Sequence, residues 1–170
     1  MNLSDVKLPR ELETDGTAEA IRRVLETRTI KLWPDGDLSI PMITMGEALK
    51  KVLRRASMNS QVRWGLEAIS HKLKEEEKGI SNLREGRGLP TGNRVSRLLL
   101  VSNDGAERFY RSIEHLLKAH TPRLFACMLD IDGNGFGSVV TGKDQQIKVI
   151  MAEHKVAVAD ILRAICIKET

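Results

Sequence analysis

A strand–helix–strand pattern occupies residues 95–135, which read VSRLLLVSNDGAERFYRSIEHLLKAHTPRLFACMLDIDGNG. Residues 95–101 form an apolar run with β-branched ends, and residues 124–129 form a second apolar run. Runs of this length predict two buried strands, and the helical spacing of the apolar residues between them predicts a helix that ends before Pro122. A connection of this kind is right-handed, so the two strands are expected to be parallel.

More strands are expected after this unit. Asp132-Gly-Asn-Gly135 is typical of a hairpin turn and predicts an antiparallel strand over residues 136–140. A further strand is expected near 147–151 and a final helix over 155–165. Residues 95–170 are therefore predicted to form a small α/β domain with a mixed sheet of three or four strands and flanking helices.

The first half of the chain, residues 1–83, is predicted to be mainly helical with a short β-hairpin near 29–42. Pro34-Asp35-Gly36 predicts the hairpin turn, because proline presets the first turn position and glycine tolerates a positive φ. Thr44 and Glu47 have the spacing of a capping box, which predicts a helix start. A longer helix is expected from Ser60 to about Leu83.

The intervening residues 84–94 read REGRGLPTGNR, and their glycines and proline predict a linker. The whole chain of 170 residues is thus expected to be α+β, or a small α/β protein. No apolar run approaches the roughly 20 residues of a membrane span. The start of the chain shows no apolar segment typical of a signal peptide. With only two cysteines, these features predict a cytoplasmic protein without a membrane partner or a disulfide scaffold.

The formal net charge is +4, and basic residues gather at two places. In the helix after Thr44, positions four apart lie side by side, which suits contacts to phosphate groups. The leading interpretation is a non-enzymatic binding or regulatory module that contacts nucleic acid or a phosphorylated ligand. The alternative is that this basic face is only the solvated side of the helix. The candidate contact residues are Lys50, Lys51, Arg54 and Arg55 on the helix, with Arg87 and Arg94 in the linker.

Acidic residues cluster where the two predicted parallel strands end. Because the carboxyl ends of parallel strands meet at one sheet edge, Asp104 and the pair Asp130 and Asp132 are expected there together. With Asn134 they form a candidate site for Mg²⁺ or Ca²⁺. The alternative function is therefore a Mg²⁺-dependent phosphoryl-transfer or hydrolytic enzyme that uses Asp130 and Asp132. The structural alternative is a turn in which these side chains bond the nearby backbone, with Asp104 as a helix N-cap.

The segment from 129 to 135 resembles parts of three known motifs. It is similar to an EF-hand calcium loop, although Thr141 stands where that loop needs a bidentate glutamate. It also resembles the first motif of haloacid-dehalogenase-type phosphatases, which would make Asp130 a nucleophile and Asp132 an acid/base. Finally, Asp130, Asp132 and Gly135 resemble the metal motif of the Toprim fold, but the glutamate of that fold is absent after the first strand.

The predicted helix over 60–83 also leaves apolar surface unassigned. Trp64 and Ile80 are not needed for its inward face. Exposed apolar residues on a long helix are typical of contacts between protein chains. Self-association into a homo-oligomer is therefore a further expectation.

Overall fold

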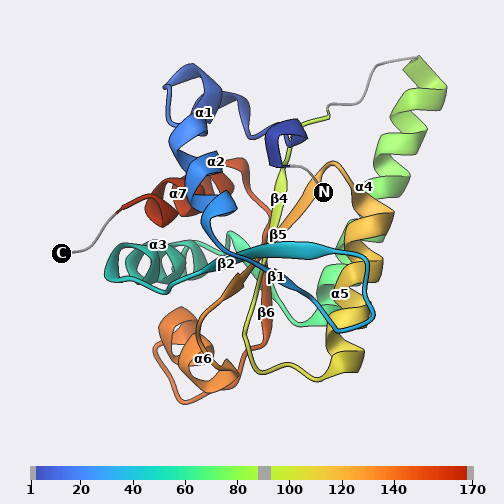
Figure 1. Ribbon diagram of the computed structural model, residues 1–170. Coiled ribbons are helices and arrows are strands. Elements are labelled where there is room, and N and C mark those ends of the chain that lie inside the picture. The colour runs from blue at the N-terminus through green and yellow to red at the C-terminus, as the bar shows by residue number, and fades with distance from the viewer. Residues whose placement is uncertain (1–2, 88–92, 168–170) are drawn as a thin grey trace.

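A single six-stranded sheet organises the chain in a computed structural model, which describes residues 3–87 and 93–167 and the side chains of all these except 84–87. The strand order across the sheet is β1-β2-β5-β4-β6-β3 (Figure 1). The strands are β1 (Thr29–Lys31), β2 (Ser39–Ile43), β3 (Val62–Trp64), β4 (Arg97–Val101), β5 (Leu124–Leu129) and β6 (Val149–Ala152). The helices are the short 3₁₀ turn η1 (Leu3–Asp5), α1 (Arg10–Thr14), α2 (Ala18–Thr27), α3 (Glu47–Met58), α4 (Leu66–Arg87), α5 (Glu107–His120), α6 (Gly133–Thr141) and α7 (Lys155–Ile165).

The sheet is mixed, so the predicted class of a combined α and β protein is confirmed. Strands β2, β5 and β4 are parallel neighbours, which includes the predicted parallel pair. Strands β1, β6 and β3 each run antiparallel to the strand beside them. The expectation of three or four strands was too low. Since β1, β2 and β3 come from residues 1–83, the expected linker at 84–94 does not divide the described chain into two sheets.

Helices cover both faces of the sheet (Figure 1). Helices α4 and α5 pack on one face, and α1, α2, α3, α6 and α7 pack on the other. Successive side chains of a strand point to opposite faces, so Leu99 and Val101 of β4 pack under α4 and α5 while Leu98 and Leu100 pack on the other side. Burial on both faces explains why β4 and β5 are continuous apolar runs.

The predicted strand over residues 136–140 is wrong, because these residues lie in helix α6. Asp132 is the N-cap of this helix, and its carboxylate accepts a hydrogen bond from the Gly135 N–H at 2.7 Å. An aspartate three residues before a free amide begins a helix as readily as it closes a turn. Residues 136–140 are too few for their periodicity to distinguish a helix from a strand.

The predicted helix from Ser60 is also corrected. Ser60 has a left-handed backbone with φ of 56°, and the next residues form the edge strand β3. Gly65 then turns the chain with φ of +89°, and α4 begins at Leu66. The helix predicted from Thr44 does form, but it begins at Glu47 and its N-cap is Gly46.

The predicted hairpin is confirmed, because β1 and β2 pair antiparallel around residues 34–36. Its turn is held against α5. The buried carboxylate of Glu114 accepts hydrogen bonds from the backbone N–H groups of Asp37 and Leu38 at 3.2 and 3.4 Å. Gly36 fits beside this carboxylate, where a side chain would collide with Glu114 and Trp33. The final helix is also confirmed at its predicted bounds. Among the described helices, none has the length and apolar character required to cross a membrane.

Candidate functional site

One candidate site lies at the edge where the parallel strands β4 and β5 end. Strand β4 leads into α5 on one face of the sheet, whereas β5 leads into α6 on the other. The strand ends where neighbouring connections diverge are the usual place of a ligand site in an open α/β sheet. The sequence prediction that Asp104, Asp130 and Asp132 lie at a common edge agrees with this topology.

Hydrogen bonds connect the polar residues that follow the two strands. Ser102 Oγ donates to Asp104 Oδ1 at 2.8 Å, and Asn103 Nδ2 donates to Asp130 Oδ1 at 3.2 Å. The backbone N–H of Gly133 also donates to Asp104 Oδ1, at 3.0 Å. Asp104 is therefore not the N-cap of α5, which is Ala106. It caps the first residue of α6 instead, from the neighbouring strand end.

Two basic side chains neutralise this acidic edge. Lys148 Nζ lies 3.5 Å from Asp104 Oδ1, and an Arg28 guanidinium nitrogen lies 3.8 Å from Asp130 Oδ2. Partial burial raises the pKa of Asp104, but the hydrogen bonds from Ser102 and Gly133, with the charge of Lys148, hold that pKa below its ordinary value. The carboxylate is thus kept ionised by groups of the chain itself.

The candidate metal ligands are bound to protein groups. Asp104 and Asp130 have the partners just described, and Asp132 Oδ1 caps the Gly135 amide. Asn134 is exposed in the first turn of α6. The segment is therefore helical there and does not form the extended loop of an EF-hand. Within residues 3–87 and 93–167, no three His, Cys, Asp or Glu side chains are grouped as metal ligands. The Mg²⁺ or Ca²⁺ site stays a prediction from the sequence.

The basic face of α3 lies on the other side of the sheet from α4 and α5. Lys50 pairs with Glu47 at 3.2 Å, and Arg55 pairs with Asp160 at 3.5 Å. Lys51 and Arg54 have no ion-pair partner in the described part of the chain. The guanidinium of Arg54 lies over Gly142, the residue that ends α6. The face therefore offers two unpaired cations on a convex helix surface.

The structure describes the side chain of only one of the two linker arginines, Arg94. Arg94 donates from its guanidinium to the Leu8 carbonyl at 3.0 Å, so it fastens the N-terminal segment beside the start of β4. The side chain of Arg87 lies outside the described residues. Their predicted contact with phosphate groups is untested.

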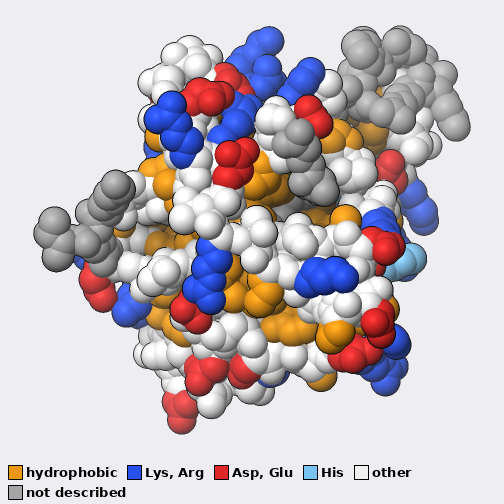
Figure 2. All heavy atoms as spheres, in the orientation of Figure 1, with side chains coloured by type: hydrophobic (Ala, Val, Ile, Leu, Met, Phe, Trp, Pro, Cys, Tyr) orange, Lys and Arg blue, Asp and Glu red, His pale blue; other side chains and the backbone are white. Residues whose placement is uncertain are grey.

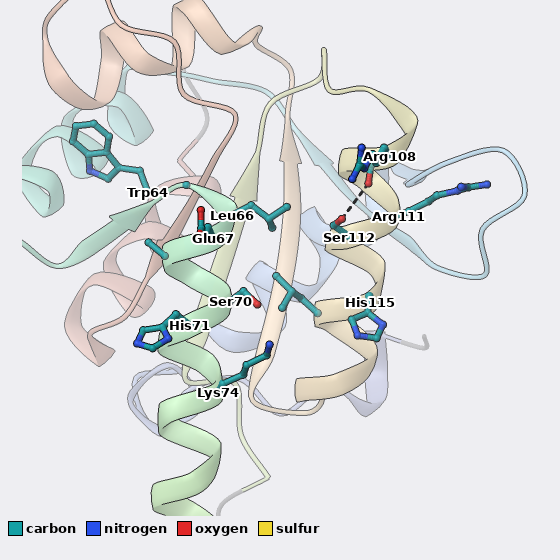
Figure 3. Close-up of a pocket in the computed structure, with 13 residues that line it drawn as sticks. Trp64, Leu66, Glu67, Ser70, His71, Lys74, Arg108, Arg111, Ser112 and His115 are labelled. Atoms are coloured by element: carbon teal, nitrogen blue, oxygen red, sulfur yellow. Dashed lines mark hydrogen bonds between the residues drawn. The ribbon is translucent and has the colours of Figure 1, made fainter.

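A groove between α4 and α5 has a volume of about 1270 Å³ (Figure 3). Strand β3 is parallel to β4 through the shared antiparallel neighbour β6, so α4 and α5 both begin at the same sheet edge. The partial positive charges of two helix N-termini therefore lie at one end of the groove. Leu66 and Leu116 both line the groove. Figure 3 shows Lys74 pointing from α4 toward α5.

The groove contains several basic side chains that differ in their partners. Arg111 is bound to Glu107 at 3.3 Å and stacks on the Trp33 ring 4.6 Å from its centroid, pointing away from α4. Lys74 and Arg108 have no ion pair among the residues that the structure describes. These two cations are available to a ligand without breaking an internal contact.

Apolar surface continues along α4 beyond the groove. Trp64, just before the helix, is 40% exposed, and Figure 3 shows its ring on the side away from α5. Ile80 is partly buried, and Leu83 is 50% exposed where α4 extends past the sheet (Figure 1). Of the two residues expected to support self-association, Trp64 is exposed and Ile80 is partly buried, and the self-association remains a prediction.

The groove was not predicted from the sequence. Lys74 and Arg108 belong to different helices, and only the strand order of the sheet brings those helices together. A local signal did exist in Arg63-Trp64-Gly65, where an exposed aromatic residue and a glycine precede a helix. A tryptophan left outside the apolar face of a helix is a marker of a contact surface.

No protein-family model matches this chain, and no curated protein matches it as a relative.

Proposed function

We propose that this chain is a nucleic-acid-binding module that takes a single-stranded segment into the groove between α4 and α5. The observation that supports this most is the placement of two unpaired cations, Lys74 and Arg108, on either side of an apolar floor. Phosphate groups and bases need these two kinds of surface in alternation. The sequence also predicted a binding role, but on the basic face of α3 and in the linker instead of in this groove.

The size of the groove favours an extended ligand. Sites for small molecules usually enclose about 300–1000 Å³. The groove has about 1270 Å³ and is bounded by the sides of two helices, Leu66–Arg87 and Glu107–His120. A chain of several nucleotides fits such a volume better than one small metabolite does.

The chemistry of the groove suits a nucleotide chain. Lys74 and Arg108 can each bind a phosphate oxygen, and the N-terminal ends of the two helices add favourable charge there. Leu66, which is partly exposed, provides an apolar surface for the faces of bases above the buried Leu116. Trp64 extends this surface around the start of α4 and can stack on a further base.

The convex basic face of α3 is the second candidate surface for the same function. It is favoured by the unpaired Lys51 and Arg54. It has no apolar floor between them, so it would contact phosphates without stacking on bases. The two surfaces lie on opposite faces of the sheet and can be tested separately.

The test is fluorescence anisotropy with labelled mixed-sequence 12-mers of RNA and DNA, each single- and double-stranded, at low and moderate salt. Two double variants make a matched pair: Lys74→Glu with Arg108→Glu in the groove, and Lys51→Glu with Arg54→Glu on α3. Both change the net charge equally, so a general charge effect is the same in each. We expect salt-dependent binding of single strands. We also expect the groove pair to weaken it by about tenfold or more, since hydrogen bonds to charged groups contribute about 1.5–3 kcal/mol.

Three results would contradict the proposal. Absence of binding to all four nucleic acids at low salt would remove the function itself. An equal loss of affinity in both double variants would mean that binding depends on the net charge of the chain and not on the groove. A larger loss in the α3 variant would assign the function to the surface expected from the sequence.

A further inference from the structure

A second cavity, of about 660 Å³, lies at the sheet edge where β4 begins, far along the strands from the acidic edge. It is lined by residues of α1, of the segment that leads into β4, and of α7. Figure 2 shows charged side chains gathered over α1 at this end of the molecule. Its lining includes Pro9, Arg10, Val95, Lys155 and Val158.

The walls of this cavity are fixed by contacts within the chain. Arg163 of α7 binds Asp15 at 2.7 Å and Glu11 at 3.2 Å, which ties α7 to the α1 region. The Val95 N–H donates to the Lys7 carbonyl at 2.8 Å, so the segment before β4 is tied to the N-terminal segment. A cavity whose walls are held in this way loses little freedom when a ligand binds.

The cavity has positive charge that the chain does not neutralise. Its acidic residues, Glu11 and Asp15, are both engaged by Arg163. Arg10 and Lys155 have no ion-pair partner within residues 3–87 and 93–167. Two free cations that face one cavity attract an anion into it.

The remaining lining is partly apolar and also includes the polar residues Thr14, Ser96 and Arg94. Pro9, Val95 and Val158 come from three different parts of the chain and contribute side chains to the same cavity. A volume of about 660 Å³ lies inside the usual range for small-molecule sites, about 300–1000 Å³. A lining that combines apolar side chains with charged groups can orient an organic molecule by its charged end.

We infer that this cavity binds a small organic anion, with its carboxylate or phosphate group between Arg10 and Lys155 and its apolar body toward Pro9 and Val95. The site is separate from the groove between α4 and α5, since it lies on the other face and at the other edge of the sheet. It therefore does not depend on the proposed nucleic-acid function.

The experiment uses the full chain labelled with ¹⁵N and follows its backbone amide signals. Benzoate and phenyl phosphate are the anionic probes, and benzyl alcohol is the neutral probe of similar size. We expect both anions, but not the alcohol, to shift the signals of residues 95–96 and 158 in a saturable way. The two anions distinguish a carboxylate site from a phosphate site by their relative affinity.

Variants identify the charged contacts. Arg10→Gln with Lys155→Gln is expected to weaken anion binding by about tenfold or more, because hydrogen bonds to charged groups contribute about 1.5–3 kcal/mol. Lys51→Gln with Arg54→Gln removes the same charge from α3 and should leave the affinity unchanged. The inference is overturned if neither anion shifts these signals, if benzyl alcohol shifts them equally, or if both double variants weaken binding to the same extent.

Discussion

The carboxylate of Asp104 accepts a hydrogen bond from the backbone N–H of Gly133 at 3.0 Å, which joins the end of β4 to the start of α6. Strand β5 runs parallel to β4 and leads directly into α6, so this contact fixes two strand ends relative to each other. Ser102 and Lys148 hold the same carboxylate. The acidic residues at this edge therefore stabilise the fold, in addition to forming a candidate site.

Replacement of Asp104 by asparagine should destabilise the chain by about 1 kcal/mol at pH 7, through loss of a charge-assisted hydrogen bond to Gly133. The pKa of Asp104 is lower in the folded chain, so its stabilisation is present above the unfolded pKa of about 3.9 and is lost as the pH falls through the folded pKa. Urea unfolding at pH 7 and pH 3 measures this. The difference between the native chain and the variant should shrink at pH 3, and an unchanged difference would contradict the account.

Helix α6 can form only if residue 137 has no side chain. A Cβ at Gly137 would overlap the backbone of Gln145 and approach Ile147 N. Because the obstacle is backbone, Gly137→Ala should cost about 1–3 kcal/mol or more. Gly79→Ala is the matched control, since Gly79 lies in α4 with nothing near its Cβ direction. It should stabilise by about 0.5–1 kcal/mol. The midpoints of thermal unfolding of both variants in one buffer test this. Equal changes in the two midpoints would contradict the steric role of Gly137.

His120 should make the chain less stable in mild acid. Burial lowers the pKa of its imidazole, and the nearby Glu77 and Glu76 only partly offset burial and the charge of Arg123. Protonation is therefore easier in the unfolded chain, where the pKa is about 6.5. Stability is full above that value and declines as the pH falls through it toward the folded pKa. The variant His120→Gln should lose less stability than the native chain between pH 7.5 and 5.5, as measured by urea midpoints. A larger loss in the variant would show the opposite sign.

The two cysteines should differ in their reaction with a thiol reagent. Cys127 is fully buried in β5, and burial raises the pKa of its thiol well above its usual value. Cys166 is only partly buried at the end of α7. Since the thiolate is the reactive form, Cys166 should react first in the folded chain and Cys127 only after unfolding. Titration with Ellman's reagent tests this, with Cys166→Ser as the control. A fast-reacting thiol in that variant would contradict the placement of Cys127.

Much of the fold was predictable where the sequence signal is local. Apolar runs for β4 and β5, and proline with glycine in the β1–β2 turn, each specify their element from neighbouring residues. The three-residue strand β3 gives no such signal, because it is defined by its pairing with β6 about 90 residues later. Helix α6 was mistaken for a strand, because its N-cap Asp132 also suits a turn.

The candidate sites also differ in whether local sequence or long-range strand order determines them. The meeting of Asp104 and Asp130 at one edge followed from two adjacent parallel strands, which the sequence predicted. The groove that contains Lys74 and Arg108 required the position of α4, and hence the antiparallel strands β6 and β3. Long-range strand order of that kind cannot be derived from periodicity in one sequence.

The most direct test of the proposed function is a titration of the ¹⁵N-labelled chain with a single-stranded RNA 12-mer, observed through its backbone amide signals. The account predicts that the largest shifts occur at the N-terminal halves of α4 and α5, around Lys74 and Arg108, with smaller changes along α3. Shifts confined to α3 around Lys51 and Arg54, or no shifts at all at low salt, would contradict the assignment of the groove.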